Sequence, residues 1–251
     1  MKALITGASS GIGRELARLL ASKCVCLILT GRDTGRLDAL KQELSVHTSL
    51  QLETIAADLS SKEACIQMHA AHPDVDLLVN NAGFGDFGPF WETSLEKEVN
   101  MIETNIMALH ILTKLYLKDM VRRDSGQILN VASIAGFLPG PLMATYYATK
   151  AYVVRLSEAV RKELSTRGSQ VKISILCPGP VDTGFPGTAN ISFHFRGKDV
   201  RQVAEYTLAH LDRFYIVPGL SVSAARILAS ALPSSLLSEA VYFLQNRRAK
   251  P

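Results

Sequence analysis

One stretch, Thr6-Gly7-Ala8-Ser9-Ser10-Gly11-Ile12-Gly13, decides the fold that this sequence predicts. The apolar run before it, residues 3–5, is typical of a strand, and the apolar spacing of residues 14–20 is helical. The first amides of a helix have no partner inside the helix, and they lie at the positive end of its dipole. A glycine-rich turn that leads from a strand into such a helix therefore indicates a site for a diphosphate.

The spacing within this stretch, T-G-x-x-x-G-x-G, differs from the common dinucleotide pattern G-x-G-x-x-G. Gly7, Gly11 and Gly13 remove side chains that would block the backbone or allow a positive φ. Ser9 and Ser10 can add hydroxyl donors beside Ile12. A tight strand-to-helix turn without any ligand is the alternative that this stretch leaves open.

The composition fits a globular α/β protein. The chain has 251 residues, of which 47% are hydrophobic, and its net charge is +4 from 27 basic and 23 acidic residues. It has no long basic run, so we expect no nucleic-acid partner. Cys24 and Cys26 lie two apart on an expected strand, so they should share one face, and no second pair completes a metal site. We therefore expect buried, reduced thiols in a cytoplasmic protein, with no signal peptide before the first strand.

Helical and strand patterns alternate along the whole chain. This order predicts one domain over residues 1–251, an α/β fold with a doubly wound parallel sheet and right-handed crossovers. Ligands of such sheets bind beyond the carboxyl ends of the strands. After the first strand and helix, the expected strands cover residues 25–29, 50–56, 76–79, 128–131, 171–176 and 214–217, and the expected helices cover 37–44, 61–69, 94–121, 146–164 and 199–211.

The residues after the second and third strands bear on the choice of cofactor. Gly31 supplies no carboxylate for a ribose hydroxyl, and Arg32 offers a planar fork suited to phosphate, which favours NADP over NAD. Alternatively, Arg32 is a solvated surface charge. Asp58 can accept a hydrogen bond from adenine, with Leu59 against the ring, or it can merely cap the helix that starts near Ser61.

The strongest chemical pattern is Tyr146 and Lys150, which lie four residues apart and so share one face of a helix. A free tyrosine has a pKa of roughly 10, and a nearby ammonium and an oxidised nicotinamide both favour the phenolate and lower that pKa. Tyr146 can then exchange a proton with a substrate oxygen that Ser133 holds by a hydrogen bond. Asn105 lies in an apolar helical stretch, where a polar amide side chain indicates a specific role. Chance spacing on the helix and a core hydrogen bond are the alternatives.

Together, these motifs resemble the short-chain dehydrogenase/reductase family. The resemblance covers nearly the whole chain, and its motifs follow in order: Thr6-Gly7-x-x-x-Gly11-x-Gly13, Asn80-Asn81-Ala82-Gly83, Ser133, Tyr146-x-x-x-Lys150 and Pro178-Gly179. It implies a Rossmann fold, a nicotinamide cofactor and a catalytic set of Asn105, Ser133, Tyr146 and Lys150.

The resemblance also implies a role for each residue. Tyr146 is the acid/base, Lys150 binds the nicotinamide ribose, Ser133 orients the substrate, and Asn105 holds a helix kink and a water. A homodimer or homotetramer is implied through the long helices from Ser94 and Tyr146. Asn81, Ala82 and Gly83 line the adenine-ribose side, whereas Pro178, Gly179, Val181 and Thr183 flank the nicotinamide.

The substrate side is expected to be apolar. Residues 183–197 suit a flap that excludes water, and the facing candidates are Phe84, Phe87, Trp91, Ile134, Leu138 and Met143. An apolar ketone, aldehyde or secondary alcohol then fits, although these aromatic residues can equally be ordinary packing. The tail, residues 221–251, predicts two amphipathic helices, 224–231 and 236–244, that contact a partner subunit or lie on a membrane surface.

The expected function is therefore an NADP(H)-dependent oxidoreductase. An epimerase or dehydratase on the same frame, and a module that senses NADP without catalysis, are the alternatives.

Overall fold

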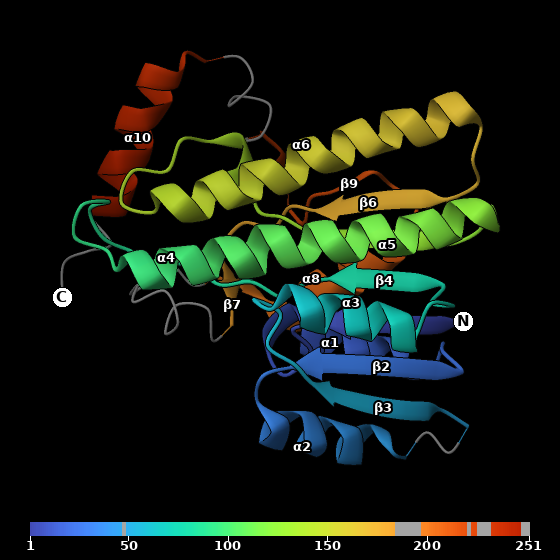
Figure 1. The fold of residues 1–251 in the computed structure, drawn as a ribbon. Coiled ribbons are helices and arrows are strands. Elements are labelled where there is room, and N and C mark those ends of the chain that lie inside the picture. The colour runs from blue at the N-terminus through green and yellow to red at the C-terminus, as the bar shows by residue number, and fades with distance from the viewer. Residues whose placement is uncertain (47–48, 184–196, 220–221, 225–231, 247–251) are drawn as a thin grey trace.

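The computed structural model describes residues 1–46, 49–183, 197–219, 222–224 and 232–246. Within these ranges, seven parallel strands form one sheet in the order β3-β2-β1-β4-β5-β6-β9. The fold is therefore the doubly wound α/β sheet of Rossmann type that the sequence predicts (Figure 1). The strands are β1 (Lys2–Thr6), β2 (Cys26–Gly31), β3 (Gln51–Ala56), β4 (Leu77–Asn80), β5 (Gln127–Val131), β6 (Lys172–Leu176) and β9 (Tyr215–Ile216).

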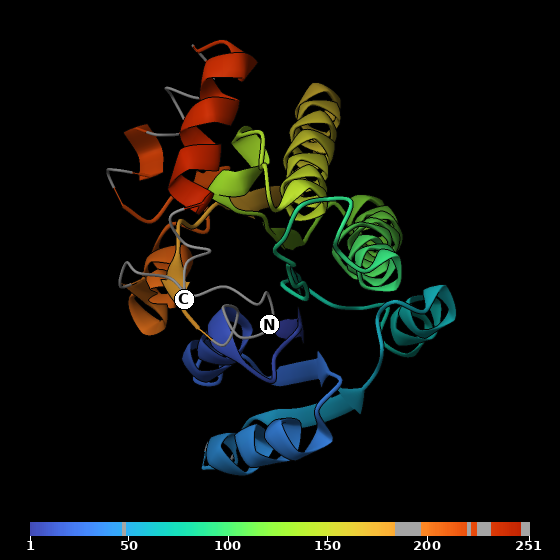
Figure 2. The same ribbon diagram turned by 90° about the vertical axis from the view of Figure 1, so that its left-hand side faces the viewer.

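Helices cover both faces of the sheet. Neighbouring residues of each strand point to opposite faces, so the apolar strands contribute side chains to a core on each side. On β1, Ala3 and Ile5 pack into one core and Leu4 into the other. The first core includes α1 (Gly11–Leu20), α2 (Thr34–Leu44) and α8 (Val200–Ala209). The second includes α3 (Lys62–Ala71), α5 (Leu109–Arg122) and α6 (Ala144–Arg167), and the two layers are seen edge-on in Figure 2.

The helix expected over residues 94–121 is not continuous. It consists of α4 (Leu95–Ile102), the π-helical turn η1 (Glu103–Ala108) and α5. A π turn inserts one extra residue into the hydrogen-bond ladder, and such turns are frequent at functional sites. Asn105 lies in this turn and is buried, and the kink that the resemblance assigns to it stays a prediction.

Two short elements flank the expected flap. β7 (Val181–Asp182) pairs in parallel with β8 (Lys198–Asp199), and this pairing brings the two ends of the segment together. Residues 184–196, most of the segment expected to be a flap, lie outside the described residues. A short 3₁₀ turn, η2 (Ile134–Phe137), follows β5.

The cysteine prediction is partly wrong. All four cysteines are buried and free, but Cys24 packs into the first core and Cys26 into the second. The reason is that β2 begins at Cys26, so Cys24 belongs to the turn after α1 and does not follow the alternation of the strand.

In the C-terminal region the structure describes α10 (Ser234–Asn246), which contains the helix expected over 236–244. The helix expected over 224–231 lies outside the described residues except for residue 224. No helix in the described ranges is long and apolar enough to cross a bilayer.

Candidate active site

The glycine-rich turn is hydrogen-bonded to the segment after β4. The Asn81 side-chain amide donates to the carbonyls of Thr6 and Gly7, at 3.0 and 3.1 Å, and Thr6 Oγ1 accepts from the backbone amides of Asn81 and Ala82. A Cβ on Gly13 would lie 2.4 Å from Asn81 Nδ2, and a Cβ on Gly7 would lie 2.9 Å from Ala82 Cα. Gly7 and Gly13 are thus needed for this internal contact, which the sequence analysis did not foresee.

The N-terminus of α1 fits a diphosphate. Its N-cap residue, Ser10, makes no side-chain capping hydrogen bond, and no acidic residue lies in the first turn. Gly11 has a φ of +54°, and a Cβ there would find Thr183 as its nearest neighbour at 3.4 Å. The cradle is therefore shaped by Gly11 and by the turn that carries Ser9 and Ile12. Thr183, which the resemblance places near the nicotinamide amide, faces this end of the helix.

The proposed cofactor-selecting residues lie at the ends of β2 and β3. Arg32 is exposed, and its guanidinium carbon lies 5.9 Å from the centroid of the Phe84 ring. Hydrogen bonds from Ser60, at 3.0 Å from the amide and 2.9 Å from the hydroxyl, lower the pKa of Asp58, and the charge of Arg32 adds to this.

The alternative role of Asp58, as the cap of the helix that follows, is not found in the structure. The helix α3 is capped by Ser61, whose hydroxyl accepts from the amide of Ala64, and not by Asp58. Leu59 is 4% exposed and its side chain belongs to the second core, and its contact with an adenine ring stays a prediction.

Asn105 links three elements. Its side chain accepts from the amide of Phe84 at 3.0 Å and donates to the carbonyl of Phe84 at 2.9 Å and to Thr149 Oγ1 at 3.1 Å. The Thr149 hydroxyl in turn donates to the carbonyl of Tyr146 at 2.7 Å. The π turn, the loop after β4 and the first turn of α6 are therefore held together. Thr149 was missed in the sequence, although it lies beside Lys150.

Lys150 is 5% exposed and reaches toward the end of β5. Its Nζ donates to the carbonyl of Val131 at 3.0 Å and lies 5.8 Å from the centroid of the Tyr146 ring. Because burial disfavours the ammonium, the pKa of Lys150 falls to about 8. A Cβ on Gly83 would lie only 2.9 Å from Asn105 Oδ1, so this glycine leaves room for the Asn105 side chain.

Tyr146 and Ser133 face each other across the crevice. Burial raises the pKa of Tyr146, and the hydrogen bond with the Ser133 side chain opposes this shift. The pKa of Tyr146 is therefore raised in the protein without its cofactor, and its lowering by an oxidised nicotinamide stays a prediction. Ser133 Oγ also lies 3.4 Å from the carbonyl of Pro178, and a Cβ on Gly179 would lie 2.9 Å from Val222. Val181 packs against the first core.

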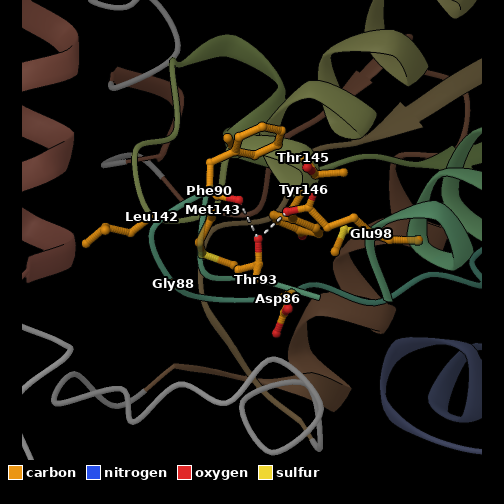
Figure 3. A pocket seen from close by; sticks show the side chains of 11 residues that line it. Asp86, Gly88, Phe90, Thr93, Glu98, Leu142, Met143, Thr145 and Tyr146 are labelled. Atoms are coloured by element: carbon orange, nitrogen blue, oxygen red, sulfur yellow. Dashed lines mark hydrogen bonds between the residues drawn. The ribbon is translucent and has the colours of Figure 1, made fainter. Parts of the chain in front are cut away.

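A small pocket opens beside Tyr146 (Figure 3). Of the residues expected to face a substrate, Met143 lines it, and Phe87 packs against Met143 in a small apolar cluster that includes Tyr146. Trp91 is 83% exposed. Sequence reasoning missed the polar part of the lining, which comes from the segment after β4 and from α4: Asp86, Thr93 and Glu98.

The described residues thus combine a glycine-rich strand-to-helix turn with a tyrosine, a buried lysine, a serine and an asparagine at one edge of a parallel sheet. The chain belongs to the short-chain dehydrogenase family, whose model matches residues 1–191. It is therefore an oxidoreductase that uses a nicotinamide cofactor.

Three known proteins illustrate the similarity. An NADP-dependent 3-hydroxy acid dehydrogenase of Salmonella typhi is 36% identical over 211 residues, which cover 82% of this chain and 81% of the relative. The short-chain dehydrogenase of Sphingobium yanoikuyae, solved with NADPH, has a TM-score of 0.84 and 30% identity over 94% of this chain and 95% of its own. A short-chain dehydrogenase/reductase of Burkholderia phymatum, solved with NAD, has a TM-score of 0.79 and 27% identity over 99% of this chain and 96% of its own.

Proposed function

We propose that the protein reduces an apolar ketone or aldehyde with NADPH, or oxidises the corresponding secondary alcohol, with Tyr146 as acid/base. The observation that carries this proposal is the joint placement of Tyr146, Ser133 and Lys150: Tyr146 and Ser133 share a hydrogen bond, and Lys150 reaches the carboxyl end of β5 beside the Tyr146 ring. The experiment is net oxidation of NADPH with a panel of carbonyl compounds, compared between the wild type and Tyr146→Phe.

The reduction needs a hydride at the carbonyl carbon and a proton at the oxygen. The reduced nicotinamide supplies the hydride when it is bound. Tyr146 donates the proton, and its raised pKa keeps the phenol protonated at neutral pH, which suits a proton donor. The Ser133 hydroxyl holds the same oxygen, and the Lys150 ammonium stabilises the phenolate that remains. Asn105 keeps the first turn of α6 in place and, we propose, holds a water through which the phenolate regains its proton.

We propose that Arg32 causes a preference for NADP by binding its additional phosphate. This residue follows β2, where a carboxylate would repel a phosphate, and its guanidinium charge already acts on Asp58. Around the cradle, Ser9, Ser10, Gly11, Ile12, Asn81 and Thr183 are proposed to hold the rest of the dinucleotide. The relatives with NADPH and with NAD agree on a nicotinamide cofactor and differ in its phosphate.

Arg32→Ala is therefore expected to weaken NADPH binding by about tenfold to a hundredfold, as loss of a charge-assisted contact does, and to leave NADH binding nearly unchanged. Titration calorimetry with both cofactors measures this. Lys41→Ala is the matched control, because Lys41 is exposed in the last turn of α2, at the far end of that helix from Arg32. Equal losses for both cofactors would contradict the assignment of Arg32.

Two rival functions share this frame. An epimerase or dehydratase would use the bound cofactor transiently, so NADPH would not be consumed in the net reaction. A module that senses NADP would bind the cofactor without turnover. We favour the oxidoreductase because Asn105, Ser133, Tyr146 and Lys150 are all present and lie close together, which a sensing role would not require.

We also propose that the protein forms a homo-oligomer through α4. Leu95, Val99 and Ile102 are spaced for one helix face and are 77%, 43% and 44% exposed. An apolar stripe of this kind marks an interaction surface more often than a solvated face. The α10 helix also exposes apolar side chains, for which a partner subunit is our first proposal and a membrane surface the alternative: Leu236, Tyr242, Phe243 and Leu244.

The double substitution Leu95→Asp with Val99→Asp is expected to convert the oligomer to a monomer, because two carboxylates cannot be buried in an apolar contact without partners. Light scattering after gel filtration gives the mass. Ile66→Asp, on the exposed face of α3, is the control that should keep the oligomer. A wild-type monomer, or an oligomer that survives the double substitution, would rule out this contact.

A further inference from the structure

A network of buried polar side chains lies between the sheet and the helices α5 and α6. The side-chain amide of Asn80, at the end of β4, donates to Asn130 Oδ1 in β5 at 2.9 Å and to Thr113 Oγ1 in α5 at 3.0 Å. The side-chain amide of Asn130 donates in turn to Ser157 Oγ in α6 at 2.9 Å. Each of these four side chains is at most 2% exposed. The network therefore joins two neighbouring strands to two helices.

The stability of the fold does not explain this network. Asn80 Oδ1 is buried, and no residue that the structure describes donates a hydrogen bond to it. A buried acceptor without a partner costs free energy, so a partly satisfied network is less favourable than apolar side chains of the same volume. Buried polar side chains are best explained where their directional hydrogen bonds fix the register of two packed elements.

The register that this network fixes is that of α6 on β5. The Ser157 hydroxyl donates to the carbonyl of Val153 at 2.8 Å, so its lone pairs are left for Asn130. Lys150 lies seven residues before Ser157 and therefore on the same face of α6, and its Nζ donates to the carbonyl of Val131, the residue after Asn130. Hydrogen bonds thus tie α6 to β5 at two points about two helical turns apart, one of them in the candidate active site.

We propose that Asn130 and Ser157 are positioning residues, which hold α6 in the register that Lys150 and Tyr146 need for the reaction. This rests on the proposed function, since it takes Tyr146 as the acid/base and Lys150 as its cation. Apolar packing of α6 on the sheet is not directional and leaves its register free to shift. A shift by one residue moves a helix by about 1.5 Å, and a misplacement of about 1 Å can lower a rate about a hundredfold.

The first test is Ser157→Ala, which removes the acceptor of Asn130. We expect kcat/KM for carbonyl reduction to fall by about tenfold to a hundredfold, while the affinity for NADPH hardly changes. Thr207→Val on α8 is the matched control, because Thr207 is equally buried and its hydroxyl donates to the carbonyl of Val203 at 2.7 Å, as that of Ser157 does to Val153. This control should keep kcat/KM, even where urea unfolding shows a similar loss of stability.

A second measurement does not depend on catalysis. The rate at which an N-hydroxysuccinimide ester acetylates Lys150, relative to exposed Lys162 on the same helix, shows whether the buried lysine keeps its place. Peptide mass spectrometry gives both rates. We expect the ratio to rise severalfold in Ser157→Ala and to stay at the wild-type value in Thr207→Val.

The outcomes separate this inference from the proposed function. A Ser157→Ala protein that loses stability but keeps the wild-type kcat/KM and Lys150 acetylation would overturn the inference, because the network would then be merely structural. Equal losses of kcat/KM in Ser157→Ala and Thr207→Val would overturn it as well. If the wild type reduces no compound of the carbonyl panel, the proposed function fails, and the acetylation of Lys150 still decides whether the network positions α6.

A conservative variant keeps the test available if Ser157→Ala does not fold. Ser157→Cys retains a weak donor and a weak acceptor, so its kcat/KM should lie between those of the wild type and Ser157→Ala. It takes the place of Ser157→Ala in both measurements, with the same control and the same contradicting outcomes.

Discussion

Tyr146→Phe is expected to lower kcat/KM for carbonyl reduction by about 10²–10⁴-fold, the usual contribution of a positioned acid or base. The substitution removes the hydroxyl that donates the proton and keeps the ring against Met143 and Phe87. The affinity for NADPH should hardly change, because the cradle at the start of α1 remains intact. Steady-state kinetics and a fluorescence titration with NADPH measure the two quantities separately.

The control for this substitution is Tyr152→Phe on the same helix. The Tyr152 hydroxyl lies 2.8 Å from His110 Nδ1 on an exposed surface, so its loss should change kcat/KM by no more than about twofold. Activity of Tyr146→Phe close to that of the wild type would remove Tyr146 from the role of acid/base. A parallel loss of NADPH affinity would show instead that the substitution disturbs the cofactor site.

Lys150→Met is expected to make the protein more stable at pH 7 and nearly inactive. Burial lowers the pKa of Lys150 from 10.5 to about 8. The unfolded chain therefore binds more protons than the folded chain between these two pH values, so the free energy of unfolding rises with pH there. Below pH 8 the full cost of holding the buried ammonium is present, about 3 kcal/mol for the difference between these two pKa values.

Methionine has a similar length and no charge, so we expect a gain in the free energy of unfolding of about 1–3 kcal/mol at pH 7, reduced by the lost bond to Val131. The gain should shrink toward pH 10.5, the pKa of the unfolded lysine. Urea unfolding at several pH values measures it. Activity should fall by about 10²-fold or more, because the cation that stabilises the phenolate is gone.

Lys162→Met, exposed on the same helix, is the control that should alter neither property. A Lys150→Met protein that is less stable at pH 7 would mean that the bonds of Lys150 outweigh its desolvation. Retained activity would exclude the lysine from the chemistry.

The fold was predictable because its signals are local. Strand and helix periodicity alternates along the chain, and the glycine-rich turn after β1 specifies which strand begins the crossover. The interruption at Asn105 was less visible, since the apolar pattern continues through residues 94–121 and a π turn changes the register only locally. Only the contacts of Asn105 with Phe84 and Thr149 show why the turn forms.

The sequence allowed us to predict which residues lie together in the candidate site, but not how burial changes their pKa values. Asn105, Ser133, Tyr146 and Lys150 do lie together, but the raised pKa of Tyr146 depends on burial, which helical spacing does not reveal. Position 13 likewise needs a glycine because of the side chain of Asn81, which lies 68 positions away along the chain.

The pocket was misjudged for a related reason. Aromatic residues in the segment after β4 drew attention because they are large, yet Trp91 points to solvent while Asp86 and Glu98 line the cavity. Which side of a loop faces a pocket depends on tertiary contacts such as the Gly88–Leu142 hydrogen bond, and these leave no periodic pattern in the sequence.

The stoichiometry of the reaction tests the central claim most directly. NADPH and a ketone of the panel are incubated with the protein, and both the oxidised cofactor and the alcohol product are quantified. We predict one alcohol formed for each NADPH oxidised by the wild type, and neither product in excess of background with Tyr146→Phe that still binds NADPH. Conversion of the ketone without consumption of NADPH would contradict the account. Binding of NADPH without any conversion of the ketone would contradict it as well.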